Sequence, residues 1–440
     1  MRPAATGWPA GRWAGWLALA AVAVSLACSG GRDAAPTPDD GSDVRAEELV
    51  RLHQARDYFT LRERLGVPSA DEPPGVRVLR AATAHAFNDL ERSNRLLEPL
   101  LAEETSLSDS LRYEARRLRA RNLVRLYRYA EAGDAFGTLA SEAPAFVDSA
   151  RVADHRNWLR MTSALEDVPP QRVAARSATT LPEVGRTHVE VTIGDSVRDY
   201  AIDTGANLSV LIRSEAEGLG LEIREAGAEV LTATDVTVTA DLAVADRVRL
   251  GGIELRNVVF LVLPDEALTF PNIVIRGILG FPIVEALGEV RVRPEGGIEV
   301  PGEVPAREVR NLALHELTPY VRVGYRGDDL LCSLDTGSMR TWFWQPFFRR
   351  YRARVEAEGT ADTLSSTGAG GTRRVPGYRM EGVTLTVAGR PSAVPEAHVY
   401  TTDLGRSESS NVLHCNLGRD VLSSHGGYTL NFRSMSLLLR

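Results

Sequence analysis

The sequence YAIDTGA at residues 200–206 recurs 132 residues later as CSLDTGS at residues 332–338, and this pair decides the fold. An alternating apolar pattern, typical of a β-strand, precedes each copy at the same offset. Its members are Val189, Val191 and Ile193 before the first copy and Val321, Val323 and Tyr325 before the second. One Asp-Thr-Gly occurs by chance in roughly one chain in ten of this length, so the matched context makes the repeat informative.

A second pair of motifs follows the triplets. Ile278-Leu279-Gly280 belongs to the first copy and Asn416-Leu417-Gly418 to the second. We call these the second-glycine motifs, after Gly280 and Gly418. The number of residues from the Asp-Thr-Gly triplet to this glycine differs by six between the copies, an insertion that a surface loop absorbs easily. The sequence therefore predicts an internally duplicated β-rich unit of roughly 120 to 130 residues, a common domain size.

These motifs resemble the pepsin and retropepsin superfamily of aspartic peptidases, over residues from about 187 to 440. The resemblance implies an all-β bilobal peptidase fold with two tandem retropepsin-like lobes, at residues 183–305 and 306–440. It implies that Asp203 and Asp335 form the catalytic dyad. It gives supporting positions in the turns and the adjoining strands to Thr204, Gly205, Thr336, Gly337, Ser338, Ile278, Leu279, Gly280, Asn416, Leu417 and Gly418. Asn416 departs from the family pattern, which has an apolar residue there.

Two carboxylates suit peptide hydrolysis, because one can activate water as a base while the other donates a proton. Held close together they cannot both ionise cheaply, so the pair keeps one proton over a working pH range. Ser338 can donate a hydrogen bond to the outer oxygen of Asp335, whereas Ala206 offers Asp203 no hydroxyl. We therefore expect the charge on Asp335 and the proton on Asp203, with neither a metal nor a cofactor required.

A peptidase of this family also needs a lid over its cleft, usually a β-hairpin between the triplet and the second glycine. In the second copy the lid candidates are Gly368, Ala369, Gly370 and Gly371, for which an ordinary solvent loop is the alternative. If the fold is as the resemblance implies, Cys332 and Cys415 could be adjacent. A disulfide and two buried free thiols both remain open for them.

Residues 44–167 show apolar residues at three- and four-residue spacing, which predicts amphipathic helices. Part of this region resembles a tetratricopeptide helix pair, and a generic helical bundle is the alternative. Its expected role is docking of a substrate or a protein partner. Residues 168–182 contain Pro169-Pro170 and no sustained period, so they are expected to form a linker.

The N-terminus is expected to direct export. Residues 1–27 have the charged and apolar parts of a signal peptide and end before Cys28, which resembles a bacterial lipoprotein lipidation site. Ordinary secretory cleavage with an incidental Cys28 is the alternative. Residues 28–43 would form a flexible tether, so we expect a membrane-anchored lipoprotein on the periplasmic side or the cell surface.

The composition narrows the function further. The chain of 440 residues has a formal net charge of −7, which argues against a general nucleic-acid binder. It contains no Lys, which excludes Schiff-base chemistry on a lysine. The sequence thus predicts an exported, lipid-anchored aspartic endopeptidase that acts on peptides or proteins. The alternative is a non-catalytic envelope scaffold or peptide-binding protein with a degenerate peptidase fold.

Overall fold

The computed structural model describes residues 41–69, 71–184, 188–232, 236–294, 296–402 and 412–440. The expected signal peptide, Cys28 and most of the tether lie outside the described residues. The chain divides into two compact units, residues 1–44 and 45–440, and apart from the first residues of helix α1 every described element belongs to the second. No helix in the described part of the chain is long and apolar enough to cross a membrane.

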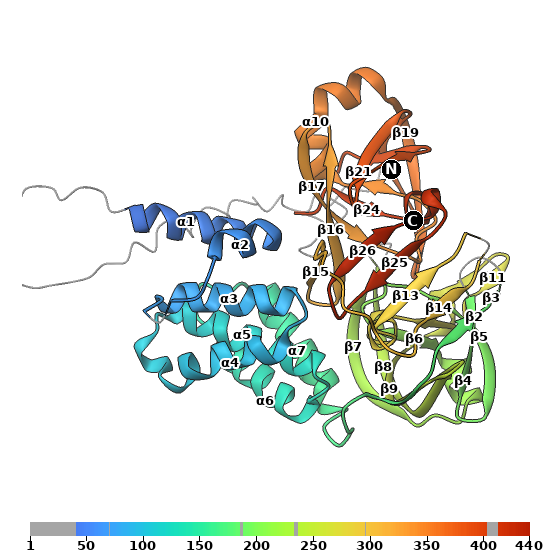
Figure 1. Ribbon diagram of the computed structural model, residues 1–440. Coiled ribbons are helices and arrows are strands. Elements are labelled where there is room, and N and C mark those ends of the chain that lie inside the picture. The colour runs from blue at the N-terminus through green and yellow to red at the C-terminus, as the bar shows by residue number, and fades with distance from the viewer. Residues whose placement is uncertain (1–40, 70, 185–187, 233–235, 295, 403–411) are drawn as a thin grey trace, which may run out of the picture. The chain divides into compact units, whose positions relative to one another are not determined.

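The helical region precedes all the strands (Figure 1). It comprises α1 (Gly41–Gln54), α2 (Tyr58–Leu65), α3 (Pro74–Ala86), α4 (Leu90–Ala102), η1 (Glu104–Ser106), α5 (Asp109–Arg125), α6 (Tyr129–Ser141) and α7 (Ser149–Ser163). Several helices begin at a side chain that accepts a backbone N–H, as Asp57, Ser108 and Asp148 do. From α3 to α7 each helix packs against the next, which buries apolar faces that one helix cannot bury alone.

The expected linker at residues 168–182 contains two strands, β1 (Arg172–Arg176) and β2 (Thr179–Leu181). β1 pairs with β9 and β2 pairs with β14, so the segment extends two sheets. Most side chains of β1 are exposed, and β1 therefore lacks the apolar alternation by which a strand is recognised in a sequence.

The first sheet carries the first triplet and has the order β1-β9-β6-β12-β5-β4-β8-β7, with β3 beside β4. Its strands are β3 (Glu183–Val184), β4 (His188–Ile193), β5 (Ser196–Ile202), β6 (Ser209–Ile212), β7 (Ile223–Leu231), β8 (Thr237–Leu250), β9 (Ile253–Leu263) and β12 (Gly277–Leu279). The connections include α8 (Arg213–Gly218), η2 (Asp265–Leu268) and the small hairpin of β10 (Thr269–Phe270) and β11 (Ile273–Val274); α9 (Phe281–Ala286) follows β12.

The second sheet carries the second triplet and has the order β19-β20-β23-β18-β24-β17-β16-β21-β22, with β15 beside β16. Its strands are β15 (Leu312–His315), β16 (Thr318–Tyr325), β17 (Asp328–Leu334), β18 (Trp342–Phe343), β19 (Thr360–Gly368), β20 (Gly371–Met380), β21 (Val383–Val387), β22 (Arg390–Val394), β23 (Ala397–Tyr400) and β24 (Cys415–Leu417). α10 (Gln345–Glu358), α11 (Arg419–Leu422) and η4 (Ser423–His425) complete this part.

The two sheets share a pairing pattern around the triplets. β12 lies parallel to β5 and antiparallel to β6 in the first sheet. β24 lies parallel to β17 and antiparallel to β18 in the second. In both sheets the strand that leads into Asp-Thr-Gly therefore pairs with the strand of the second-glycine motif.

A third sheet joins the two halves of the strand region, in the order β2-β14-β13-β25-β26. β13 (Glu289–Val292) and β14 (Ile298–Val300) follow the first sheet in the chain, whereas β25 (Tyr428–Asn431) and β26 (Ser436–Leu439) follow the second. β13 pairs with β25, and Figure 1 shows this sheet between the other two.

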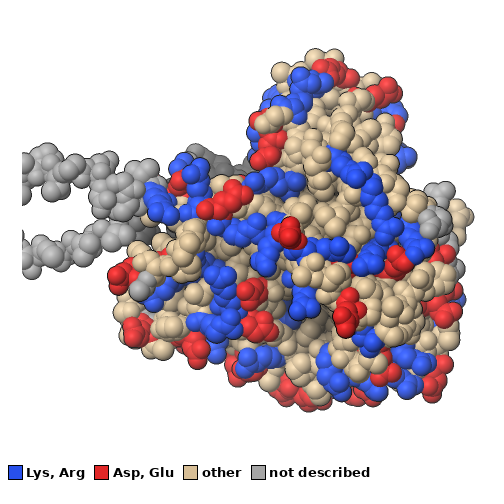
Figure 2. Space-filling model, in the orientation of Figure 1, with Lys and Arg blue, Asp and Glu red and all other residues tan. Residues whose placement is uncertain are grey.

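Ion pairs connect the helical region to both larger sheets. Arg322 on β16 binds Asp57 at 2.9 Å, and Arg125 at the end of α5 binds Glu285 on α9 at 2.8 Å. On the face shown in Figure 2, basic side chains gather where the helices meet the strands, with acidic side chains among them. Because the sequence has no Lys, all of these basic side chains are Arg, which can hold a carboxylate with two parallel hydrogen bonds.

Candidate active site

Both aspartates stand directly after a strand and are fixed by the neighbouring second-glycine motif. Asp203 follows β5, and its backbone N–H donates to the carbonyl oxygen of Leu279 at 3.0 Å. Asp335 follows β17, and its N–H donates to the carbonyl oxygen of Leu417 at 3.0 Å. The motifs that the sequence singled out therefore come together, in the same way, in both halves.

The second glycines are required by close backbone contact. A Cβ atom on Gly280 would lie 2.7 Å from the carbonyl oxygen of Ala206, and one on Gly418 would lie 2.9 Å from the backbone nitrogen of Arg340. Both distances are shorter than real Cβ contacts. Only glycine lets these strands lie against the turns that hold the aspartates.

The two turns are locked to each other through their threonines. The N–H of Thr204 donates to Oγ1 of Thr336 at 3.0 Å, and the N–H of Thr336 donates to Oγ1 of Thr204 at 3.1 Å. The Thr204 hydroxyl also donates to the carbonyl oxygen of Leu334 at 2.9 Å. Both threonines are buried, so these bonds are shielded from competition with water.

The glycines of the triplets bring each turn against the opposite aspartate. A Cβ atom on Gly205 would lie 2.7 Å from Cγ of Asp335, and one on Gly337 would lie within 3.0 Å of the Asp203 carboxyl group. Each triplet glycine therefore lies so close to the carboxyl group of the opposite half that no side chain fits at its position.

Backbone N–H groups bind both carboxylates. Oδ1 of Asp203 accepts from Gly205 at 2.7 Å and from Gly337 at 3.2 Å. Oδ1 of Asp335 accepts from Gly337 at 3.0 Å and from Ser338 at 2.8 Å. The Gly337 N–H is thus shared between the two aspartates.

The prediction that the Ser338 hydroxyl donates a hydrogen bond to Asp335 is wrong. The hydroxyl donates to the carbonyl oxygen of Arg340 at 2.8 Å and accepts from Nε1 of Trp342 at 3.2 Å. The turn after the triplet brings the Arg340 carbonyl within reach of this short side chain, so the hydroxyl is used locally. Only the backbone of Ser338 binds the aspartate.

The side-chain donor to Asp335 is Asn416, which stands where the family pattern has an apolar residue. Nδ2 of Asn416 donates to Oδ2 of Asp335 at 2.8 Å. Its amide is oriented by Ser333, whose hydroxyl donates to Oδ1 of Asn416 at 2.5 Å. Ile278 occupies the equivalent position in the first sheet and offers Asp203 no donor. The two halves of the site therefore differ in whether a side chain donates to the aspartate.

The surroundings of Asp203 favour its protonated form. Burial, the charge of Asp335 and a hydrogen bond with that carboxyl group raise the pKa of Asp203 to about 8, although the N–H groups of Gly205 and Gly337 act in the opposite direction. The direction of this shift favours a proton on Asp203, which is the side that the sequence predicted. The donor that favours charge on Asp335 is Asn416 rather than the Ser338 hydroxyl.

The glycine-rich lid candidate lies at the turn of a hairpin, the second hairpin, formed by β19 and β20. Gly368 and Gly371 are paired at its end, with Ala369 and Gly370 between them. Gly370 and Gly371 have φ values of +86° and +112°, which side chains other than glycine rarely adopt. The N–H of Gly370 donates to the carbonyl oxygen of Ala267 at 3.0 Å, so the tip reaches the first half of the strand region.

The first hairpin, formed by β7 and β8, occupies the equivalent interval, and its turn at 233–235 lies outside the described residues. It is held by the helical region. The side chain of Asn157 on α7 donates to the carbonyl oxygen of Glu229 at 2.9 Å and accepts from its N–H at 2.8 Å. Arg224 on β7 also donates to the carbonyl oxygen of Ala164 at 3.0 Å.

A disulfide joins Cys332 and Cys415, which settles the alternatives left open by the sequence. The two residues are direct neighbours on the parallel strands β17 and β24. The bridge therefore links the strand before Asp335 to the second-glycine strand beside it.

Sequence reasoning missed the polar roles of Asn416 and Asn157. The only signal for Asn416 was its departure from the family pattern, and no periodic signal marks Asn157. Across the described residues, no group of three or more His, Cys, Asp or Glu side chains is arranged to hold a metal ion.

Comparison with known proteins finds one family model and solved structures that are similar to part of this chain. A family model described as aspartyl protease matches residues 189–283, which include Asp203 and the first second-glycine motif. Among solved structures, the chain is similar to a retropepsin-like aspartic protease from Rickettsia conorii, at 19% identity and a TM-score of 0.22, over 30% of this chain and 92% of that chain. A search of curated proteins found no match. Residues 189–283 are therefore similar to the aspartyl protease family.

Proposed function

We propose that the protein is an aspartic endopeptidase and that Asp203 and Asp335 are its catalytic dyad. The observation that carries this is the interlocked pair of turns, in which Gly337 donates to both carboxylates and each triplet glycine lies against the opposite aspartate. A peptide-binding scaffold has no need of two converging carboxyl groups, one of which holds a proton. Two tandem retropepsin-like lobes would supply one aspartate each.

The hydrogen bonds assign a role to each carboxyl group. Asp335, stabilised as an anion by Asn416 and two backbone N–H groups, would take a proton from a water molecule bound between the aspartates. Asp203 would donate its proton to the substrate carbonyl oxygen as the water attacks, which gives a neutral tetrahedral intermediate. Asp335 would then donate the proton it took from the water to the amide nitrogen, while Asp203 takes a proton from one hydroxyl group of the intermediate. The C–N bond breaks, the carboxylic acid and amine products leave, and the dyad regains its starting protonation.

The location and partners of the enzyme are part of the proposal. Lipidation of Cys28 after export would anchor the protein to a membrane on the periplasmic side or at the cell surface. The helical region, in which α3 to α7 pack in sequence order, would act as a tetratricopeptide-like docking surface for a substrate or a protein partner.

The test is cleavage of a diverse peptide library by the purified full chain across pH 3 to 8, beside Asp203→Asn and Asp335→Asn. We expect cleavage by the wild type and its loss in both variants, with unchanged circular dichroism. A folded wild type that cleaves no peptide at any pH would refute the peptidase and favour the non-catalytic scaffold. Cleavage that persists in either variant would refute the dyad.

A further inference from the structure

The disulfide and the side-chain donor to Asp335 occupy neighbouring positions on the same two strands. Between β17 and β24, Cys332 is paired with Cys415, and Ser333 is paired with Asn416. Both cysteines are fully buried, and their Cα atoms lie 4.5 Å apart. Each residue of the polar pair therefore follows directly after a residue of the disulfide.

The polar pair depends on the register of these strands. The Asn416 amide accepts from the Ser333 hydroxyl at 2.5 Å and donates to Oδ2 of Asp335 at 2.8 Å, so one side chain must meet two partners at once. A strand advances by about 3.3 Å per residue, and hydrogen bonds weaken steeply with misalignment. Even a partial slip of β24 along β17 would therefore remove both bonds.

β24 is short and is fixed at both of its ends. It has three residues, Cys415–Leu417, and lies between β17 and β18. The disulfide holds its first residue, and the N–H of Asp335 donates to the carbonyl oxygen of its last residue at 3.0 Å. Asn416 stands between these two attachments, so the disulfide is one of the two links that set its position.

The first half holds the equivalent strands by packing instead of a covalent bond. Tyr200 and Gly277 stand where the second half has its cysteines, and a Cβ atom on Gly277 would lie 2.7 Å from Cδ1 of Tyr200. The next pair, Ala201 and Ile278, is apolar on both strands and has no amide to orient. The covalent link thus occurs in the half whose aspartate has a side-chain donor.

We propose that the Cys332–Cys415 disulfide is a positioning group of the active site, which holds the Asn416 amide on Asp335 and so keeps the charge of the dyad on that aspartate. The proposal rests on the proposed peptidase function. It gives the disulfide an effect on the chemistry in addition to its effect on stability. It also makes the pH range of activity depend on whether the two cysteines are oxidised.

The charged or titratable side chains on the segments around Asp335 are Asp203, Arg340, His414, Arg419 and Asp420. His414 directly precedes β24, and its Nδ1 accepts from the N–H of Leu331 at 3.3 Å. Burial and the charge of Arg350 lower the pKa of His414 to about 4. Because it adjoins the disulfide and titrates at acid pH, His414 needs its own control.

The experiment measures the pH dependence of kcat/KM on one cleaved peptide. It compares the full-length wild type with the double variant Cys332→Ala/Cys415→Ala, each alone and combined with Asn416→Leu. Removing the disulfide should move the acidic limb to higher pH by up to about one unit, because a weakened donor destabilises the singly charged dyad. In the Asn416→Leu background no amide is left to position, so removing the disulfide should not move the limb further.

Two controls separate the disulfide from its surroundings. Tyr200→Phe perturbs the equivalent position of the first half by removing a hydrogen bond to Glu215, at 2.7 Å, and should leave the acidic limb in place. His414→Asn offers the Leu331 N–H an acceptor but does not titrate. Removing the disulfide in this variant should shift the limb as it does in the wild type.

Oxidation of one preparation gives a second test if the double variant does not fold. The wild type is prepared with Cys332 and Cys415 as thiols and then treated with glutathione disulfide. The two thiols lose two electrons and two protons as their S–S bond forms, and the glutathione disulfide is reduced to two glutathione molecules. The acidic limb should move back to lower pH as the disulfide forms.

The outcomes distinguish this inference from the peptidase function. An acidic limb that stays in place without the disulfide would overturn the inference alone, and so would an equal shift in the Asn416→Leu background. If neither the double variant nor the reduced wild type folds, the disulfide serves the fold and the positioning role is refuted. A folded wild type without cleavage would overturn the peptidase function and this inference together.

Discussion

Replacing Asn416 with Leu tests whether the Asn416 side chain stabilises the negative charge on Asp335. Leu has the same number and branching of side-chain heavy atoms as Asn, so the change removes the donor to Oδ2 of Asp335, at 2.8 Å, and keeps a branched side chain in its place. Asp335 would keep the two backbone donors on Oδ1, from Gly337 and Ser338. The second sheet would then match the first, where Ile278 offers no donor.

The size of the effect follows from the lost hydrogen bond. A hydrogen bond to a charged group contributes about 1.5–3 kcal/mol, and about 1.4 kcal/mol corresponds to one pH unit. Losing the donor destabilises the singly charged dyad relative to the fully protonated one. The acidic limb of the kcat/KM profile, where the dyad loses its first proton, should therefore move to higher pH by about one to two units.

The alkaline limb should move little, because Asn416 binds Asp335 as an anion both before and after Asp203 loses its proton. Burial and the charge of Asp335 raise the pKa of Asp203, so activity is present below that pKa and is lost as pH rises through it.

The assay is the pH dependence of kcat/KM on one cleaved peptide, measured for the wild type, Asn416→Leu and two controls. Ser338→Ala removes a hydroxyl that donates to the Arg340 carbonyl oxygen, so it should leave both limbs in place. Ser333→Ala removes the hydroxyl that orients the Asn416 amide and should give a smaller shift in the same direction. An acidic limb in Asn416→Leu that stays at its wild-type position would refute the reasoning.

Three further changes test the geometry. Gly337→Ala places a Cβ atom within 3.0 Å of the Asp203 carboxyl group and should lower kcat by about 100-fold or more; Gly218→Ala, which meets nothing within 4 Å, is the control in the same kinetic assay. Thr204→Val removes two buried hydrogen bonds and should lower the free energy of unfolding in urea by at least about 2 kcal/mol; an unchanged midpoint would contradict the locked turns. Asn157→Ala frees the first hairpin from α7 and should speed hydrogen exchange across β7, while exchange in the second hairpin stays as in the wild type.

The backbone of the site was predictable from the sequence because close contacts restrict the residue type. Gly205, Gly337, Gly280 and Gly418 each stand where a Cβ atom would meet another chain segment. Such contacts require glycine at a fixed number of residues after each strand, and a duplication repeats this spacing along the sequence. The alternating pattern before each triplet likewise follows from one buried face in β4 and β16.

The hydrogen bonds of side chains were less predictable. The Ser338 hydroxyl donates to the carbonyl oxygen of Arg340 in its own turn rather than to Asp335. Asn416 donates to Asp335 only because β24 lies parallel to β17 in the observed register. That register joins residues 83 positions apart in the chain, as the disulfide does, and no local pattern specifies it.

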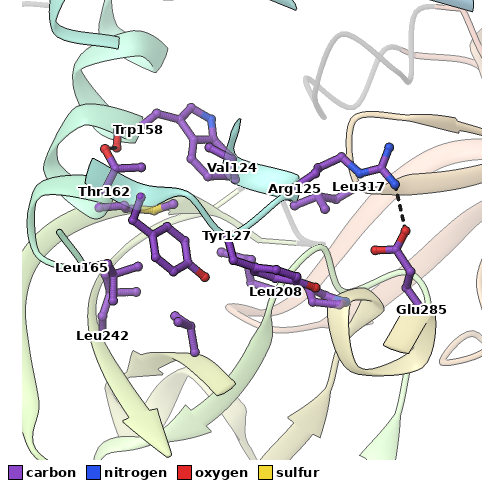
Figure 3. Close-up of a pocket in the computed structure, with 14 residues that line it drawn as sticks. Val124, Arg125, Tyr127, Trp158, Thr162, Leu165, Leu208, Leu242, Glu285 and Leu317 are labelled. Atoms are coloured by element: carbon purple, nitrogen blue, oxygen red, sulfur yellow. Dashed lines mark hydrogen bonds and ion pairs between the residues drawn. The ribbon is translucent and has the colours of Figure 1, made fainter. Parts of the chain in front are cut away.

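The helical region contacts both of the sheets that carry the aspartates. In the second sheet, the Tyr320 hydroxyl donates to the carbonyl oxygen of Arg56 at 2.8 Å, before α2. Toward the first sheet, Arg125, with a side chain only 2% exposed, binds Glu285 on α9. Removing the Glu285 carboxylate, which binds Arg125 in Figure 3, while the fold stays intact would leave a buried cation without its anionic partner, which is strongly unfavourable. Because each sheet carries one aspartate, helices bound to both sheets restrain the distance between the two carboxyl groups.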